Sequence, residues 1–174
     1  MSTKSDAPTR EELHAHYVWL TSNGTSGNRL DKSNANCSGA EFSGVNLTKA
    51  ILKGTNFEKA VLVGTNFTGA DLSGANLTSA DANGAQFTGA NLSGANLSHA
   101  RMAGAECSGA SFVKAILKKA NLPGALLTNA DFTDADFTGS DLDAADLTGS
   151  KQDHIHLKGA KTVDTHGLVN QKAE

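Results

Sequence analysis

A period of five residues runs through most of this chain and limits how the chain can fold. Counting in fives from Cys37 to Leu157 gives 25 central positions without an insertion, and 20 of them are Leu or Phe. The residue two places earlier is Ala in 19 of the 25 units. On an α-helix five residues turn about 500°, so these side chains would spread over every face. On a flat strand an odd period would alternate them between two faces. Neither regular element buries the set.

A chain that turns a corner every five residues does bury it. The Ala and the central residue lie two apart, so both point inward from a short extended stretch. The other three places are rich in Gly, Asn, Asp, Ser and Thr, which favour turns. Four right-angled corners close one coil in 20 residues, and stacked coils pair as parallel strands. Each of three undersized centres, Cys37, Ala82 and Cys107, is followed by Phe at the next centre, as close packing within a layer requires.

The repeated word A-[DN]-[LF]-[ST]-G over residues 35–160 resembles the pentapeptide-repeat family. The resemblance implies an all-β solenoid, a right-handed quadrilateral β-helix of about six coils. It also implies a bacterial source. It does not imply one activity, because members share a scaffold and not a chemistry.

The flanking segments are expected to close the ends of the solenoid. Residues 9–24 are predicted to form a short N-terminal capping α-helix, because Thr9 and Glu12 fit a capping box. Its apolar face would consist of Leu13, Tyr17 and Leu20. Residues 1–8 are predicted to be disordered, 25–160 to form the β-helix and 161–174 to form a C-terminal cap and tail. Three apolar residues would fold over the last coil: Val163, Leu168 and Val169.

Several kinds of function are not indicated. A filled rod without inserted loops offers no pocket, so no enzyme and no cofactor are predicted. His154 and His156 lack further ligands at suitable spacing, so no metal site is predicted. The net charge of −3 argues against direct binding of nucleic acid. Two cysteines, no apolar leader and no apolar run of membrane-spanning length lead us to expect a cytoplasmic protein without membrane contact.

Two groups of surface residues are candidates for contacting a partner. The first is an acidic C-terminal end formed by Asp131, Asp134, Asp136, Asp141, Asp143 and Asp146, which would attract a basic partner. The second is an apolar surface patch at places where Asn or Asp usually stands: Ile51, Val61, Ile116 and Leu126. These four are otherwise explained as isolated apolar residues of an ordinary surface.

The predicted function is therefore a non-enzymatic scaffold that presents a rigid surface to an unidentified protein, as a monomer or a weak end-to-end dimer. The alternative comes from the family resemblance: some members mimic DNA, bind a type II topoisomerase (DNA gyrase) and confer quinolone protection. A DNA-like rod about 30 Å long would carry a charge on the order of −17, against −3 for this chain. Ice binding by a Thr column is a weaker possibility, because the neighbouring column of side chains is mixed.

Overall fold

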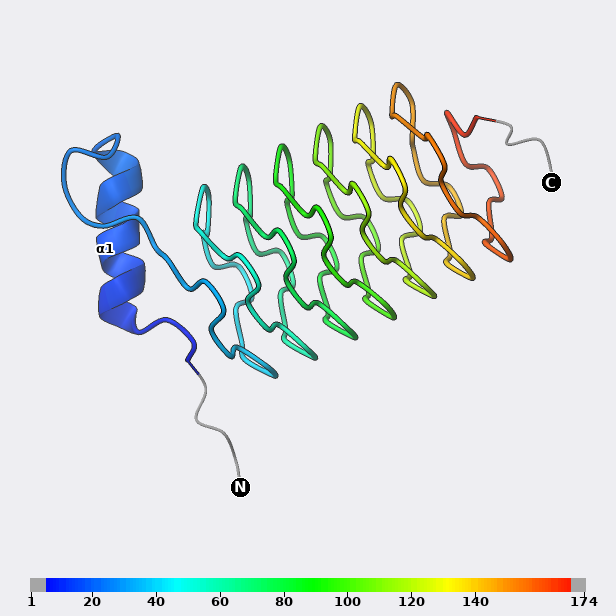
Figure 1. The fold of residues 1–174 in the computed structure, drawn as a ribbon. Helices are drawn as coiled ribbons and strands as arrows, with labels where there is room; N and C mark the ends of the chain where they lie inside the picture. Colours follow the sequence, from blue (N-terminus) through cyan, green and yellow to red (C-terminus); the bar gives the residue numbers. More distant parts are fainter. Residues whose placement is uncertain (1–5, 170–174) are drawn as a thin grey trace.

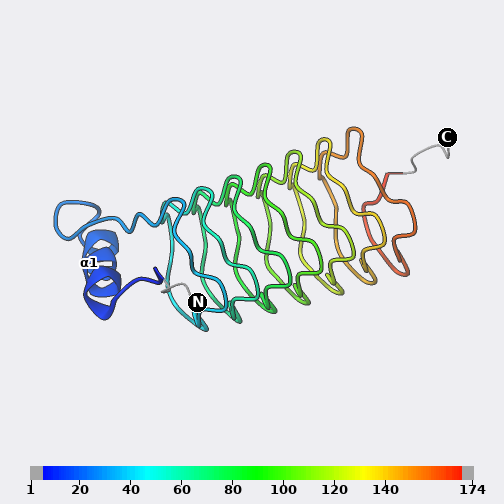
Figure 2. The same ribbon diagram turned by 60° about the horizontal axis from the view of Figure 1, so that its bottom comes forward.

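The structure, a computed structural model that describes residues 6–169, is a straight rod of stacked square coils with a helix at one end (Figure 1). Its backbone is joined by 24 parallel bridges, each between a residue and the one 20 positions later, from Asp31↔Ile51 to Asp146↔His166. The predicted right-handed quadrilateral β-helix is confirmed. The turned view shows the coils stacked without an inserted loop (Figure 2).

Every side of a coil uses the same hydrogen bonds. A single bridged residue is followed by the inward-pointing centre and then by a two-residue turn. The N–H of the centre Leu77 donates to Asn96 O in the next coil at 2.7 Å, and Asn96 N–H donates back to Ala75 O at 2.9 Å. Ala80 N–H closes the turn by donating to Leu77 O at 3.0 Å. Each side contributes only one bridged residue, so the sheet consists of isolated bridges.

The interior is filled by the central residues and by the Ala places beside them. Central Phe side chains stack on one another from coil to coil, with ring centroids 5.0 Å apart for Phe67 and Phe87 and 5.1 Å apart for Phe112 and Phe132. The small centre Ala82 precedes Phe87 within one layer, and both are buried. Both cysteines are free and buried, in agreement with their interpretation as small core residues.

The second residue of each turn has a positive φ, which is the reason for the glycine in the repeat. Gly74 has φ 65°, in the left-handed region that suits a residue without Cβ. Lysine occupies four of these corners, with φ between 55° and 58°: Lys49, Lys59, Lys114 and Lys119. A side chain with Cβ is disfavoured there, so these corners are less stable than glycine would make them.

The helix α1, Arg10–Thr21, lies across the N-terminal end of the rod (Figure 1). Its capping box is confirmed: Thr9 Oγ1 accepts from Glu12 N–H at 3.2 Å, and Glu12 Oε2 accepts from Thr9 N–H at 2.7 Å. The predicted apolar face is wrong in one residue, because Tyr17 is 59% exposed and His16 is fully buried instead. His16 faces the rod because its Nδ1 accepts the backbone N–H of Leu30 at 3.1 Å.

The boundaries of the β-helix differ from those expected. The bridged span runs from Asp31 to His166, which is 136 residues or 6.8 coils of 20, so residues 161–166 continue the last coil. Val163 and Val169 are exposed and do not cover that coil, whereas Leu168 packs against the core. Of the segment expected to be disordered, residues 6–8 are described, and Asp6 N–H donates to Asn36 O at 2.7 Å. The remainder of that prediction, and the end of the predicted tail, lie outside the described residues.

Candidate interaction surfaces

Two hollows formed by described residues lie near the ends of the rod. One of about 530 Å³ lies at the C-terminal end and is lined by Ser150, Lys151, Gln152, Asp153, His154 and Val169. One of about 180 Å³ lies between α1 and the first coil and is lined by Trp19, Leu20, Asn23, Gly24 and Lys49. Within residues 6–169 no group of three or more His, Cys, Asp or Glu side chains is placed to hold a metal ion.

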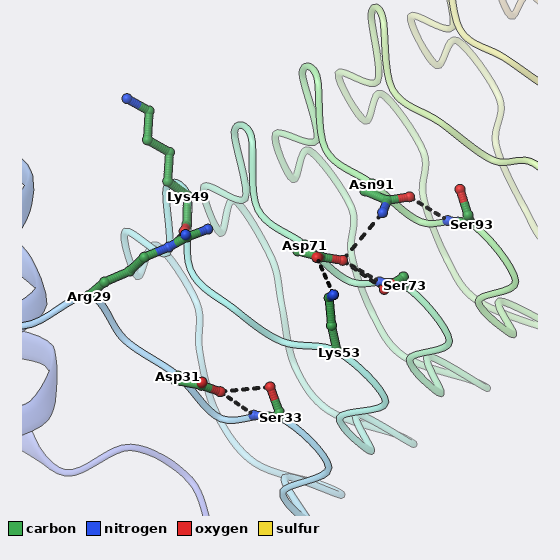
Figure 3. A network of polar contacts seen from close by, with 9 residues as sticks. All are labelled: Arg29, Asp31, Ser33, Lys49, Lys53, Asp71, Ser73, Asn91 and Ser93. Carbon is green, nitrogen blue, oxygen red and sulfur yellow. Dashed lines mark hydrogen bonds and ion pairs between the residues drawn. The ribbon is translucent and has the colours of Figure 1, made fainter.

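Polar side chains at the bridged places are occupied with holding the turns. Figure 3 shows this on one side of the first coils. Asp71 accepts hydrogen bonds from Ser73 Oγ at 2.7 Å and from Asn91 Nδ2 at 3.3 Å, and its carboxylate lies 3.4 Å from Lys53 Nζ. Partial burial alone would raise the pKa of Asp71, but the bonds from Ser73 and Lys53 outweigh it and lower the pKa. Carboxylates of this kind stabilise the coil and are not poised for acid–base chemistry.

Three of the six aspartates of the predicted acidic end are paired with lysines. The ion pairs are Asp131 with Lys151 at 3.1 Å, Asp136 with Lys118 at 3.1 Å and Asp141 with Lys161 at 3.0 Å. The Lys161 bond is the largest cause that lowers the pKa of Asp141. For Asp131 the largest cause is the bond from Thr133, with Lys151 adding to it. These pairs reduce the negative potential that a basic partner would meet.

The other three aspartates of this group make weaker or purely local contacts. Asp134 Oδ1 lies 3.2 Å from His154 Nδ1, an ion pair only when the imidazole is protonated. Asp143 Oδ1 accepts from Val163 N–H at 2.9 Å, and Asp146 Oδ1 accepts from Thr148 N–H at 2.9 Å. The bridged aspartates 131, 136, 141 and 146 fall on four successive sides, so the group forms a ring around one coil.

The proposed apolar patch is not one patch. Bridged residues stack in one column only when their numbers differ by a multiple of 20, and the four bridged columns contain Ile51, Val61, Ile116 and Leu126 one each. Ile116 and Leu126 are exposed, while Ile51 and Val61 are half-buried. The prediction of a shared patch is therefore wrong, because a four-sided coil separates these residues onto four faces.

Sequence reasoning missed the cationic partners of the aspartates. It compared charges along the chain, within one stretch, whereas Lys118 and Lys161 come from neighbouring coils. The signal was present in the period: Asp141 and Lys161 are 20 residues apart and therefore stacked. His16 and Lys32, which join α1 to the first coil, gave no comparable signal.

Comparison with known proteins agrees with this geometry. A family model described as pentapeptide repeats matches in 8 copies, over residues 33–62, 55–94, 90–129 and 117–149. The solved structure of HetL from the cyanobacterium Nostoc is 30% identical and superposes with a TM-score of 0.56, covering 78% of this chain and 71% of HetL. Rfr23 from the cyanobacterium Cyanothece is 35% identical with a TM-score of 0.52, covering 52% of this chain and 63% of Rfr23. A protein of the Arabidopsis thaliana thylakoid lumen is 37% identical over 61% of this chain and 67% of that protein, with a TM-score of 0.46. No match is found among curated protein sequences.

Proposed function

Since this chain belongs to the pentapeptide-repeat family, we propose that it acts as a non-enzymatic scaffold whose rigid outer surface binds a protein partner. One observation carries the proposal. The bridges keep a single register from Asp31 to His166, and the central residues from Cys37 to Leu147 are all buried. Such a rod has a filled interior and no inserted loop, so its recognition chemistry has to lie in the side chains that point outward.

A rigid surface suits protein recognition because little conformational entropy is lost on binding. Nearly every backbone N–H along the rod is already paired, so a partner is expected to contact side chains and not add a strand. HetL, which is similar to this chain, is described as involved in the regulation of heterocyst differentiation. A regulatory role exerted through a protein contact is compatible with the surface described above.

The cell compartment and the source belong to the same proposal. Two buried free thiols suit a reducing compartment, so we place the activity in the cytoplasm of a bacterium. Among the described residues no helix is long and apolar enough to cross a membrane. The acidic ring is retained as a further contact, for a basic surface of a protein partner, and its three lysine pairs weaken it. The same pairs count against DNA mimicry, which depends on uncompensated negative charge.

The experiment is affinity capture from the source organism with the full chain as bait, followed by reconstitution from purified components. We expect one protein to co-purify and to form a complex of defined stoichiometry in size-exclusion chromatography with light scattering. A gyrase supercoiling assay with the chain at about micromolar concentration runs in parallel, and no inhibition is expected there. Capture of nucleic acid alone would overturn the proposal. Inhibition of supercoiling would replace it with the DNA-mimic alternative.

A further inference from the structure

One side of the rod departs from the repeat at Ile116. Its bridged residues are, in order, Asn36, Asn56, Asn76, Asn96, Ile116, Asp136 and His156. The asparagines form a ladder: Asn56 Nδ2 donates to Asn36 Oδ1 at 3.3 Å, and Asn76 Nδ2 donates to Asn56 Oδ1 at 3.0 Å. Each Oδ1 also accepts the N–H two residues later, as Asn96 does from Ser98 at 3.0 Å. We call this face the asparagine side.

Ile116 interrupts the row of asparagines in the fifth coil. Its side chain stands between Asn96 and Asp136 and is 39% exposed. An Asn here would accept the N–H of Lys118, as Asn96 Oδ1 accepts that of Ser98 at 3.0 Å. Ile cannot, and it places apolar surface in water instead. Ile116 therefore does not take part in the side-chain hydrogen bonds that stabilise the rest of the asparagine side.

Lysines occupy the two corners on either side of Ile116. Lys114 has φ 58° and Lys119 has φ 55°, where most other corners carry glycine. Both side chains are exposed, and no ion pair is recorded for either within residues 6–169. Lys118 lies between them and pairs with Asp136 at 3.1 Å. His99 is next to them in the preceding coil, since its N–H donates to Lys118 O at 2.9 Å. We call this group the basic patch: His99, Lys114, Ile116, Lys118 and Lys119.

We propose that the basic patch is a docking site for an acidic segment of a protein partner, with an apolar side chain of that segment packed on Ile116. The inference rests on the proposed function and deepens it by naming the face and the chemistry of the partner. An exposed apolar residue surrounded by charges is arranged like a protein–protein interface. In such interfaces the charged rim speeds the encounter with the partner, and the apolar residues buried at the centre stabilise the complex. The lysine ammonium groups are complementary to carboxylates at that rim.

Nucleic acid fits the patch less well. A phosphate backbone makes no use of an exposed Ile at the centre of the site. A strand running along the rod would also meet Asp134 and Asp136 in the next coil, and the chain as a whole has a charge of −3. A protein segment on the patch would also lie next to Asp136, but that carboxylate is already paired with Lys118 at 3.1 Å.

The other misplaced apolar residues lack this setting. Leu126 is more exposed, at 46%, but the corners that flank it are Gly124 and Asn129. Ile51 is half-buried, and the nearby Lys53 pairs with Asp71 at 3.4 Å. Among the described residues, only the coil of Ile116 has an exposed apolar residue at a bridged place with a lysine at each of the two corners beside it.

The test uses a variant that restores the repeat: Lys114→Gly, Ile116→Asn and Lys119→Gly together. Each change installs the residue that the fold itself prefers at that place, so the variant is expected to melt at or above the wild-type temperature. The matched control is Lys49→Gly, Lys59→Gly and Leu126→Asn, which removes the same charge and makes the same kinds of substitution outside the patch. A library of random peptides displayed on phage is panned against the full wild-type chain, and the enriched peptides are then measured on both variants.

We expect the selected peptides to combine Asp or Glu with Leu, Ile or Phe. Their affinity, measured by fluorescence anisotropy, should fall at least about tenfold for the restoring variant and stay unchanged for the control. Binding should weaken as salt is raised. The proposal is overturned if no acidic peptide is enriched, if the restoring variant binds equally well, or if a labelled DNA duplex binds the patch in preference to the peptides. None of these results decides whether the chain captures a protein from its source, so the proposed function is tested separately.

Discussion

The ion pair that joins α1 to the first coil permits a quantitative test of how the rod is capped. Lys32 occupies a central place, five residues before Cys37, where the following coils bury apolar side chains. Its side chain is only 16% exposed, and Nζ lies 2.8 Å from Glu12 Oε1. The other oxygen of Glu12 accepts from Thr9 N–H at 2.7 Å. One carboxylate therefore both caps the helix and neutralises a cation at the end of the core, and the Lys32 bond is the largest cause that lowers the pKa of Glu12.

The perturbation is Glu12→Ala. Loss of the capping interaction costs about 1 kcal/mol. Leaving a mostly buried ammonium without its partner costs a further 1–2 kcal/mol or so, as an order-of-magnitude figure. The expected total is about 2–3 kcal/mol of unfolding free energy. Lys32→Met removes the charge and supplies an apolar side chain, so alone it should be close to neutral. The double variant should lose only the capping interaction, which is about 1 kcal/mol of unfolding free energy. Thr9→Ala, which removes the other half of the capping box, should lose about the same amount.

The assay is urea denaturation of the four variants, combined with hydrogen exchange of backbone amides. Because terminal coils of a repeat array loosen first, Glu12→Ala should accelerate exchange at Cys37 N–H, which donates to Asn56 O at 2.8 Å. Exchange at Leu97, in the middle of the rod, should be unaffected. If Glu12→Ala costs as much in the Lys32→Met variant as in the wild-type chain, the coupling is zero and the reasoning is refuted. The reasoning is also refuted if Lys32→Met lowers the unfolding free energy as much as Glu12→Ala does.

Three further outcomes are expected. Burial lowers the pKa of His16, so the unfolded chain takes up the proton first as the pH falls. The contribution of His16 to the unfolding free energy should be fully present above about pH 6.5 and decline below it. Melting temperatures measured between about pH 7 and 5 would contradict this if they fell as steeply for His16→Gln as for the wild-type chain. Burial raises the pKa of Cys37 to about 11 and that of Cys107 further. Both thiols should therefore resist a disulfide reagent at neutral pH until urea is added. Rapid labelling of Cys107 in the native chain would count against its place in the buried core. Phe67→Ala should cost about 3–5 kcal/mol in urea denaturation, since Phe67 stacks on Phe87; a loss below about 1 kcal/mol would mean that the coil closes around the cavity.

Most of the fold was predictable because the period acts locally and repeats. An inward Ala and an inward centre in every unit determine the corner, and the corner determines the register of 20 that every bridge obeys. The orientation of α1 was not predictable in the same way. Hydrophobicity favoured Tyr17 as a buried residue, but the N–H of Leu30 at the open end needs an acceptor, and the imidazole of His16 supplies it. That requirement arises only when the helix and the first coil meet.

The surface was harder to predict than the core, because a departure from the repeat has two different physical meanings. At Lys32 and Gln152 a polar side chain replaces an apolar centre, and each finds a partner inside the molecule. Lys32 pairs with Glu12, and Gln152 Nε2 donates to Gly167 O at 2.8 Å while its Oε1 accepts from Val169 N–H at 3.0 Å. These two departures lie in the first and the last coil, so they close the ends of the stack.

The departures around Ile116 are of the other kind. Lys114 and Lys119 occupy corners that favour glycine, and Ile116 leaves its ladder and exposes apolar surface. Lysine at a positive-φ corner and exposed apolar surface are each disfavoured in the isolated chain, and no ion pair within residues 6–169 involves Lys114 or Lys119. A local rule broken without internal compensation is expected at functional sites. The compensation is therefore sought in a contact with another molecule, and replacing all three residues by those of the repeat should separate stability from binding, keeping or raising the first while weakening the second.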